Sequence, residues 1–177
     1  MIVIGNIYGT IESPIQDETN FSGKVVFNKD DAIRHNGYVA YVSIAFFQGS
    51  NSPNISLYVI SPTMDIDCFQ VIYRYRIPKG TNSNDFNQEK IVLPDSTVYL
   101  ETGQFLAIGF DSFSGSPKHV ANRKHYALCL NQVDAVYGTN RAVKFDKGNL
   151  QVAFSFHLVP TQGKSFSNSE SINIMLF

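Results

Sequence analysis

Residues 91–110 (IVLPDSTVYLETGQFLAIGF) predict a strand, a Pro-Asp-Ser turn, a second strand, a tight Glu-Thr-Gly corner and an unusually apolar third strand. In residues 105–110 alternate side chains share a face. One face carries Leu106, Ile108 and Phe110, and the other carries Phe105, Ala107 and Gly109. A strand that is apolar on both faces is typical of the centre of a sheet covered from above and below. We therefore expect the rest of the chain to be arranged around it.

Other segments show strand patterns too. Residues 38–47 (YVAYVSIAFF) are apolar at almost every position and predict a second central, doubly covered strand. Residues 68–77 alternate with a period of two, which predicts one face with Phe69, Val71, Tyr73, Tyr75 and Ile77, and an opposite face with Cys68, Gln70, Ile72, Arg74 and Arg76. Residues 150–158 alternate as well, with Gln151, Ser155 and His157 expected to point outward.

No window keeps the helical spacing i, i+3, i+4 and i+7, and residues 126–130, 133–137 and 142–145 also predict short strands. Roughly eight to eleven short strands, separated by turn signals, are typical of an antiparallel sandwich. The sequence predicts an all-β fold, an antiparallel β-sandwich that is jelly-roll-like. We expect an N-terminal arm with a possible strand in residues 1–20, the sandwich domain in 21–160, and a linker with a C-terminal strand in 161–177.

The C-terminal segment is apolar at alternate positions, Ile172, Ile174 and Leu176, after a polar linker. Such a strand either folds back on its own sheet or pairs with the edge of another subunit. Residues 2–7 could play the same part. The sequence predicts contacts with other protein subunits in a homo-oligomer, and strand exchange of the terminal arms is one of the two alternatives for how the arms are buried.

Composition narrows the class of protein. The 177 residues suffice for one domain, and 44% apolar residues exclude disorder throughout. Fourteen Phe and nine Tyr favour strands, while a net charge of -1 without a Lys/Arg run predicts no nucleic-acid binding. No stretch approaches the roughly 20 apolar residues of a membrane helix, so we expect no membrane insertion. The N-terminus lacks the features of a signal peptide, which indicates either another route or a trimmed form.

Cys68 and Cys129 match no zinc spacing and leave two alternatives, a pair of free buried thiols or one disulfide. A disulfide closing a loop of roughly 60 residues would add about 4 kcal/mol of stability in the chain-entropy model. The sequons at Asn20 and Asn54 permit glycosylation if the chain is secreted, which favours an extracellular location.

Catalytic motifs are missing from the sequence, and we expect no enzyme activity. The four histidines stand near no nucleophile elbow or zinc-protease helix, and His119 and His125 bracket Arg123-Lys124 in what reads as a solvated basic loop or a polar site. Asp65 and Asp67 are the candidate ligands for Ca²⁺, which binds about 6 to 8 oxygens. We expect no other cofactor.

Arg74 and Arg76 are predicted on the outward face of their strand, with Tyr58 on the outward face of the neighbouring strand. Arg and Tyr side chains on one sheet face could hydrogen-bond a protein partner or a glycan. The alternative is a solvated face over which long polar side chains lie.

Three segments resemble a secreted β-sandwich module of multidomain invertebrate extracellular proteins. The matching motifs are Ile-Ser-Leu-Tyr-Val-x-x-Pro at 55–62, Phe-x-Val-x-Tyr at 69–73 and Val-Tyr-Leu-x-x-Gly-x-Phe-Leu-Ala-Ile-Gly-Phe at 98–110. In those modules the last strand follows a Gly-Asp corner, whereas here Gly103 precedes Gln104. The resemblance implies a sandwich and an extracellular setting, and it transfers no functional residues.

The expected function is that of a non-enzymatic extracellular structural or adhesive module acting through protein-protein contacts. Alternatives are a glycan-binding, lectin-like module and a viral or fibre capsid-type jelly-roll protein. A glycan hydrolase on a sandwich scaffold would need two facing carboxylates in a cleft.

Overall fold

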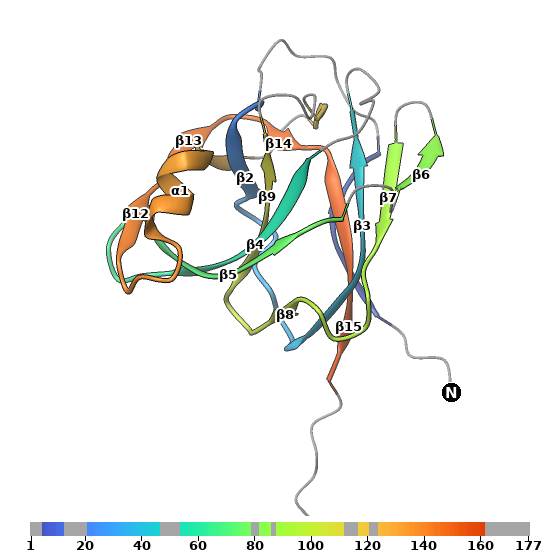
Figure 1. Cartoon of the computed structure of the whole chain (residues 1–177), viewed down its shortest axis with the longest axis horizontal. Coiled ribbons are helices and arrows are strands. Elements are labelled where there is room, and N and C mark those ends of the chain that lie inside the picture. Colours follow the sequence, from blue (N-terminus) through green and yellow to red (C-terminus); the bar gives the residue numbers. More distant parts are fainter. Residues whose placement is uncertain are drawn as a thin grey trace, which may run out of the picture.

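The computed structural model describes residues 5–12, 21–46, 54–78, 82–85, 88–111, 117–120 and 124–161, with only the backbone described in 82–85 and 88–89 (Figure 1). All strand pairs in this part of the chain are antiparallel. They form two large sheets and one short pair, β10 (His119–Val120) with β14 (Gln151–Val152). The all-β, antiparallel sandwich expected from the alternating pattern is confirmed.

The first sheet lies on the right in Figure 1 and has the order β1-β15-β3-β7-β6, with β8 also paired to β3. Its strands are β1 (Asn6–Thr10), β15 (Phe154–Pro160), β3 (Gly37–Ala45), β7 (Gln88–Val92), β6 (Asn82–Asp85) and β8 (Tyr99–Leu100). The chain crosses between this sheet and the second one several times, as a jelly-roll-like connectivity requires.

The second sheet has the order β12-β5-β4-β9-β2-β11-β13. Its strands are β12 (Ala142–Lys144), β5 (Cys68–Arg76), β4 (Ile55–Pro62), β9 (Phe105–Phe110), β2 (Lys24–Asn28), β11 (His125–Cys129) and β13 (Asp146–Gly148). β9 occupies the middle of this order, and all six of its residues are buried. The prediction of a central strand covered on both faces is confirmed.

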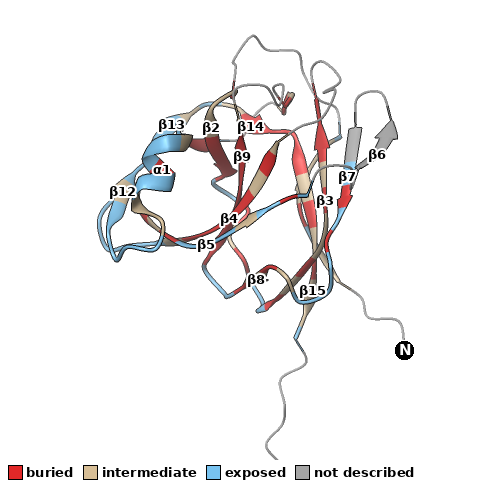
Figure 2. Cartoon of the chain, in the orientation of Figure 1, coloured by how far each residue is buried: buried red, intermediate tan, exposed pale blue. Residues whose placement is uncertain are grey.

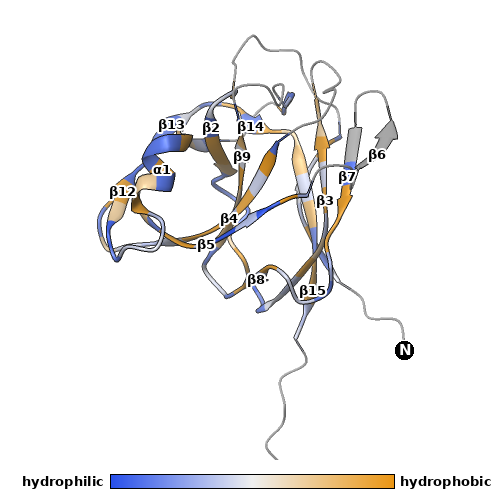
Figure 3. Ribbon diagram, in the orientation of Figure 1, coloured by the Kyte–Doolittle hydropathy of each residue, from blue (hydrophilic) through white to orange (hydrophobic). Residues whose placement is uncertain are grey.

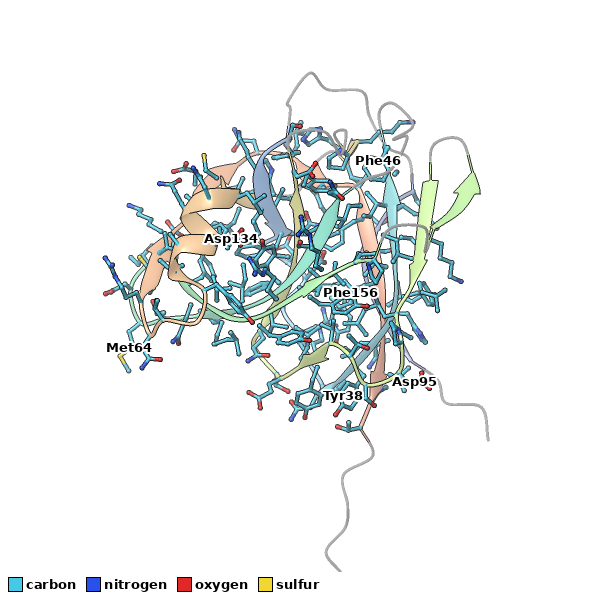
Figure 4. The ribbon with its side chains drawn as sticks, in the orientation of Figure 1. Tyr38, Phe46, Met64, Asp95, Asp134 and Phe156 are labelled. Atoms are coloured by element: carbon cyan, nitrogen blue, oxygen red, sulfur yellow. The ribbon has the colours of Figure 1, made fainter. Side chains whose placement is uncertain are left out.

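The inter-sheet core fills the space between the two sheets. Leu106, Ile108 and Phe110 of β9 belong to it, as the parity of residues 105–110 predicted. From the first sheet, Phe156 enters this core and stacks on Tyr8, with ring centroids 5.1 Å apart and an interplanar angle of 9° (Figure 4). Figure 2 shows the buried residues along the facing strands of the two sheets.

A second core lies on the other side of the second sheet, because that sheet is nearly closed into a barrel. Residues 142–144 pair with β5 and residues 146–148 pair with β11, so one continuous segment joins the two ends of the strand order. Phe145, between the two pairings, is 1% exposed and points into this barrel core. The barrel core also contains Phe27, Phe69, Phe105 and Tyr126.

The helix α1 (Leu130–Val136) covers this barrel core on the left of Figure 1. The sequence predicted a strand at 133–137 and no helix, and this prediction was wrong. The helix has seven residues and buries only Val133, so it is too short to repeat an amphipathic pattern. No helix in the described part of the chain is long and apolar enough to span a membrane.

A β-bulge in β5 changes which face its side chains occupy. Tyr73 lies opposite Val59 and Val71 lies opposite Ile60, so Ile72 is the extra residue. Before the bulge, Phe69 and Val71 enter the barrel core, whereas after it Tyr75 and Ile77 contact the inter-sheet core. The prediction that all five alternate residues share one face was wrong, because an inserted residue reverses the parity.

The prediction for β3 was half right. The strand lies in the middle of the first sheet, between β15 and β7. Val39, Val42 and Ile44 enter the core, but Tyr38 and Tyr41 on the other face are only half-buried. Only one face of β3 is therefore covered in the described structure, because no second layer lies outside the first sheet there.

Candidate functional site

Asp65 and Asp67 lie in the turn between β4 and β5. Asp67 has a left-handed backbone (φ 61°), and its carboxylate accepts a hydrogen bond from Tyr126 Oη at 2.9 Å and pairs with Lys147 Nζ at 2.8 Å. The hydrogen bond from Lys147 lowers the pKa of Asp67. Both carboxylate oxygens thus hold the turn against β11 and β13.

This geometry does not fit a calcium ion. A Ca²⁺ at Asp67 would have to displace the Lys147 ammonium, and the described residues contain no group of three or more His, Cys, Asp or Glu side chains placed for a metal. The assignment of Asp65 and Asp67 as metal ligands stays a prediction without structural support.

Tyr58 and Arg74 do lie side by side, since they are directly paired between β4 and β5. This face is covered at Tyr58, because α1 packs against β5 there and its Asp134 reaches the Tyr58 hydroxyl, whereas Arg74 stays exposed (Figure 4). Tyr58 is 1% exposed and donates to Asp134 Oδ1 at 2.8 Å, while Arg74 Nη1 donates to the same oxygen at 2.9 Å. Burial, followed by the hydrogen bond to Asp134, raises the pKa of Tyr58.

The expectation that Tyr58 faces outward was therefore wrong, since the missed helix supplies both its cover and its acceptor. Arg74 extends this contact, with its guanidinium 4.9 Å from the centroid of the Tyr137 ring. Arg76 is exposed on β5 and remains a candidate partner contact.

The cysteines are both free, Cys68 half-buried and Cys129 exposed, so the structure has neither the disulfide nor two buried thiols. They lie on β5 and β11, which are not neighbours in the sheet. Asn54 is half-buried just before β4, and its backbone carbonyl accepts a bond from Asp111 N–H at 3.3 Å. The glycosylation prediction is untested there. Asn20 and the C-terminal Ile172, Ile174 and Leu176 lie outside the described residues.

A buried cluster of polar side chains connects the ends of β2, β10, β11 and β14. Asp31 accepts hydrogen bonds from Asn28 Nδ2 at 3.0 Å and Gln151 Nε2 at 3.4 Å, and Asn28 Oδ1 accepts from Val152 N–H at 2.9 Å. Gln151 is 0% exposed, so the expectation that it faces outward was wrong. Its neighbour Val152 is also buried, because β14 lies inside the cluster.

His119 and His125 belong to the same buried region and do not form a solvated loop. Both rings contact Phe21, with centroids 5.0 and 4.9 Å from it. His125 Nδ1 hydrogen-bonds to the Leu150 carbonyl, and burial lowers the pKa of this histidine. The two histidines therefore work as packing groups that hold the ends of the strands together.

A row of four side chains crosses the outer face of the first sheet, and sequence reasoning missed it. We call this the outer row: Ile7, His157, Tyr41 and Val92, which are successive cross-strand partners on β1, β15, β3 and β7. The two apolar ends, Ile7 and Val92, are 68% and 62% exposed. In Figure 3 the lower part of the β7 ribbon is hydrophobic, below a hydrophilic stretch.

Aromatic contacts fix the middle of the outer row. The Tyr41 and His157 rings stack at 5.1 Å and 25°, and Lys90 Nζ lies 4.1 Å from the centroid of the Tyr41 ring. Below the row, Tyr38 packs against Tyr99 at 4.9 Å. The signal in the sequence was that Tyr41 and Val92 stand at positions that point away from the core. Their proximity can be recognised only once the pairing of β3 with β7 is known.

Comparison with known proteins gives no family for this chain. No family model matches it, and no curated protein or solved structure does so either. The functional assignment therefore rests on the geometry of the chain itself. In the outer row, exposed apolar side chains flank an aromatic pair, Tyr41 and His157, that is held in place by stacking.

Proposed function

We propose that this protein is a non-enzymatic, extracellular structural or adhesive module that acts through protein-protein contacts, with the outer row as its contact surface. The observation that carries the proposal is the exposure of Ile7 and Val92, at 68% and 62%, on four paired strands. The half-buried Tyr41 and His157 rings lie between these two ends, so the row presents apolar and aromatic surface across all four strands. Contiguous surface of this kind marks interaction sites more often than isolated exposed residues do.

The outer row suits a protein partner because its geometry is fixed before binding. Tyr41 and His157 are held by their mutual stacking, so little conformational entropy remains to be lost on association. Full burial of an Ile or Val side chain contributes about 1.5–3 kcal/mol. Burial of Ile7 and Val92 alone would therefore support a weak contact between two proteins. The same burial combined with strand pairing would support a stable one.

Strand pairing is the second part of the proposal. β1 lies at the edge of the first sheet, so it has one side open to a further strand among the described elements. The alternating Ile172, Ile174 and Leu176 of another copy are of the kind that pairs with such an edge. A homo-oligomer joined in this way would use the outer row and the edge of β1 together.

The ionisable side chains support a non-enzymatic role. Asp67, Asp134 and His125 each bond to groups of the fold itself. These bonds hold α1, the barrel closure and β11 in place, which is a structural use of each group.

Glycan binding is a second candidate, favoured by the hydroxyl and aromatic groups around the outer row. Ser43 and Ser155 are cross-strand partners beside it, and Tyr38 and Tyr99 lie on its other side. The Tyr41 ring already contacts His157 and Lys90, which makes it a poor platform for stacking a sugar. We therefore place protein contact first.

A photo-crosslinking amino acid at position 92 tests the proposal. We expect ultraviolet light to join two protein chains through this position, while the same group at the exposed position 72 of β5, in the second sheet, gives none. Equal cross-linking from both positions would mean non-specific contact. A cross-link absent at position 92 in a sample that assembles would remove the outer row as the interface.

A further inference from the structure

The turn between β4 and β5 ends in two side chains that are almost fully exposed. Met64 is 105% exposed and Ile66 is 82% exposed, relative to a free residue of each type. We call Met64, Asp65 and Ile66 the apolar tip. Figure 4 shows Met64 at the left end of the molecule, whereas the first sheet lies on the right.

The apolar tip is held by hydrogen bonds on both sides. Thr63 N–H donates to the Cys68 carbonyl at 3.1 Å, and Cys68 N–H donates to the Asp65 carbonyl at 3.2 Å. Asp67 adds its bonds to Tyr126 and Lys147, and its carbonyl accepts from Phe145 N–H at 3.0 Å. The turn is thus ordered by polar contacts while its apolar side chains remain in solvent, which makes it a preorganised binding element.

We propose that the apolar tip of one copy docks on the outer row of a second copy. The tip offers Met64 and Ile66 on either side of the Asp65 carboxylate. The outer row offers Ile7 and Val92 at its ends, with the Lys90 ammonium beside the row. The two surfaces therefore share apolar side chains and one pair of opposite charges, Asp65 and Lys90. This inference rests on the proposed function, because it names the partner of the same surface.

The positions of the two surfaces determine the kind of assembly. The apolar tip lies at the left end of the molecule, where Figure 4 labels Met64, and the outer row belongs to the sheet on the right of Figure 1, so one copy can use both at once. A contact between two different surfaces that does not close into a ring extends as an open head-to-tail chain. The contact is small, and weak association, in the range of about micromolar to millimolar, is typical of small interfaces.

A complementation experiment tests this pairing. The tip variant Met64→Ser/Ile66→Ser keeps the outer row, and the row variant Ile7→Ser/Val92→Ser keeps the tip. We expect the wild-type chain to grow in mass with concentration, and each variant alone to require at least about tenfold more protein for the same mass. An equimolar mixture should associate at lower concentration than either variant alone, because the intact tip of the row variant can dock on the intact outer row of the tip variant. The control Ile72→Ser, at an exposed bulge residue, should behave as wild type.

The other outcomes overturn the pairing in distinguishable ways. If the row variant alone loses assembly while the tip variant keeps it, the proposed function stands and the tip is not the partner. If both variants assemble like the wild type, the outer row fails as well. Binding of the tip to vesicles of anionic and zwitterionic lipid, lost in the tip variant, would make it a membrane contact and contradict the proposal. Wild-type protein that stays monomeric at about millimolar concentration would also contradict it.

Charge reversal supplies an independent readout. Asp65→Lys should weaken wild-type assembly, and Lys90→Glu in the partner copy should restore it when the two are mixed. Both positions are exposed, so folding should be unaffected. If restoration failed with Lys90→Glu and with His157→Glu, Asp65 would not face the outer row.

Discussion

At the scale of single residues, shared carboxylate acceptors hold the most distinctive part of the fold. Asp134 of α1 accepts from both Tyr58 and Arg74, and it thereby ties the helix to β4 and β5. Asp67 does the same between the β4–β5 turn and residues 142–148, the closing segment that joins the two ends of the second sheet, through Lys147. The Arg74–Asp134 pair is more than a third exposed on both sides, so the buried Tyr58 hydroxyl matters more for stability than this ion pair.

Removing the Tyr58 hydroxyl should lower the free energy of unfolding. Tyr58→Phe keeps the buried ring but deletes the donor to Asp134, and we expect a loss of about 0.5–1.5 kcal/mol. Urea unfolding measures it. Tyr73→Phe is the matched control, because Tyr73 is 37% exposed, and it should change little. Equal stability of the two variants would show that Asp134 does not need this bond.

His125 should make the protein less stable in mild acid. Burial lowers its pKa below the ordinary 6.5, a lowering that Lys24 reinforces and the Leu150 carbonyl opposes. Between the folded and unfolded pKa the unfolded chain binds more protons, so stability is fully present above pH 6.5 and is lost as the pH falls. The slope should reach at most about 1.4 kcal/mol per pH unit.

Unfolding measured between pH 7.5 and about pH 5 checks this, with His125→Gln for comparison. The variant should be less stable overall, since it loses ring packing, but its stability should vary less with pH in this window. The Asp67 carboxyl does not interfere, because its pKa is lowered from 3.8 and it titrates below the window. An unchanged slope in His125→Gln would assign the effect to another group.

At the scale of elements, the residue pattern predicted strands well where one rule governs the whole strand. β9 was correctly predicted to be covered on both faces, because a short, continuous apolar run fits few structures other than a buried central strand. β5 was located correctly, but its faces were exchanged beyond Ile72, because nothing in the local sequence marks the bulge. α1 was missed because seven residues with one buried side chain carry no helical period.

The candidate site was harder to predict than the fold for a physical reason. The outer row consists of residues that are far apart in the sequence and become neighbours only through the order β1-β15-β3-β7. Tyr58 was misplaced for the same reason, since its environment depends on a helix that comes about 75 residues later. Pairwise tertiary contacts decide such positions, and a single sequence does not specify them directly.

The closing segment depends on Phe145. This side chain is 1% exposed, and its ring contacts Phe27 and Phe69 at centroid distances of 5.3 and 5.6 Å. Phe145→Ala should cost about 3–5 kcal/mol and release both β12 and β13. Lys144→Ala, at the exposed neighbouring position, should stay within about 0.5 kcal/mol of wild type.

Two measurements check the role of Phe145. Denaturant unfolding gives the loss of stability, and hydrogen exchange of the Phe145 amide, which donates to the Asp67 carbonyl, reports on the segment itself. The milder variant Phe145→Leu separates the two readouts. If its amide at position 145 exchanged with solvent as fast as an unprotected amide while the stability of the whole protein was kept, the segment would open independently of the core. A loss below about 1 kcal/mol in Phe145→Ala would mean that the barrel core does not rely on it.

At the scale of the whole molecule, the two sheets have different tasks. The second sheet closes around its own aromatic core and is covered by α1, whereas the outer face of the first sheet has no described layer over it (Figures 1 and 2). The barrel supplies rigidity and the apolar tip at one end, and the first sheet supplies the outer row at the other. A module that carries the two proposed contact surfaces at its two ends is suited to building a structure from repeated copies.

The most direct test of this account is the mass of the protein in solution as a function of concentration. Sedimentation of the full chain should show concentration-dependent assembly, and Ile7→Ser/Val92→Ser with an unchanged melting temperature should shift it to the monomer. A chain ending at Pro160 separates the contribution of the C-terminal strand, whose loss should weaken assembly further. A full chain that is monomeric at all concentrations, or a row variant that assembles like wild type, would contradict the account.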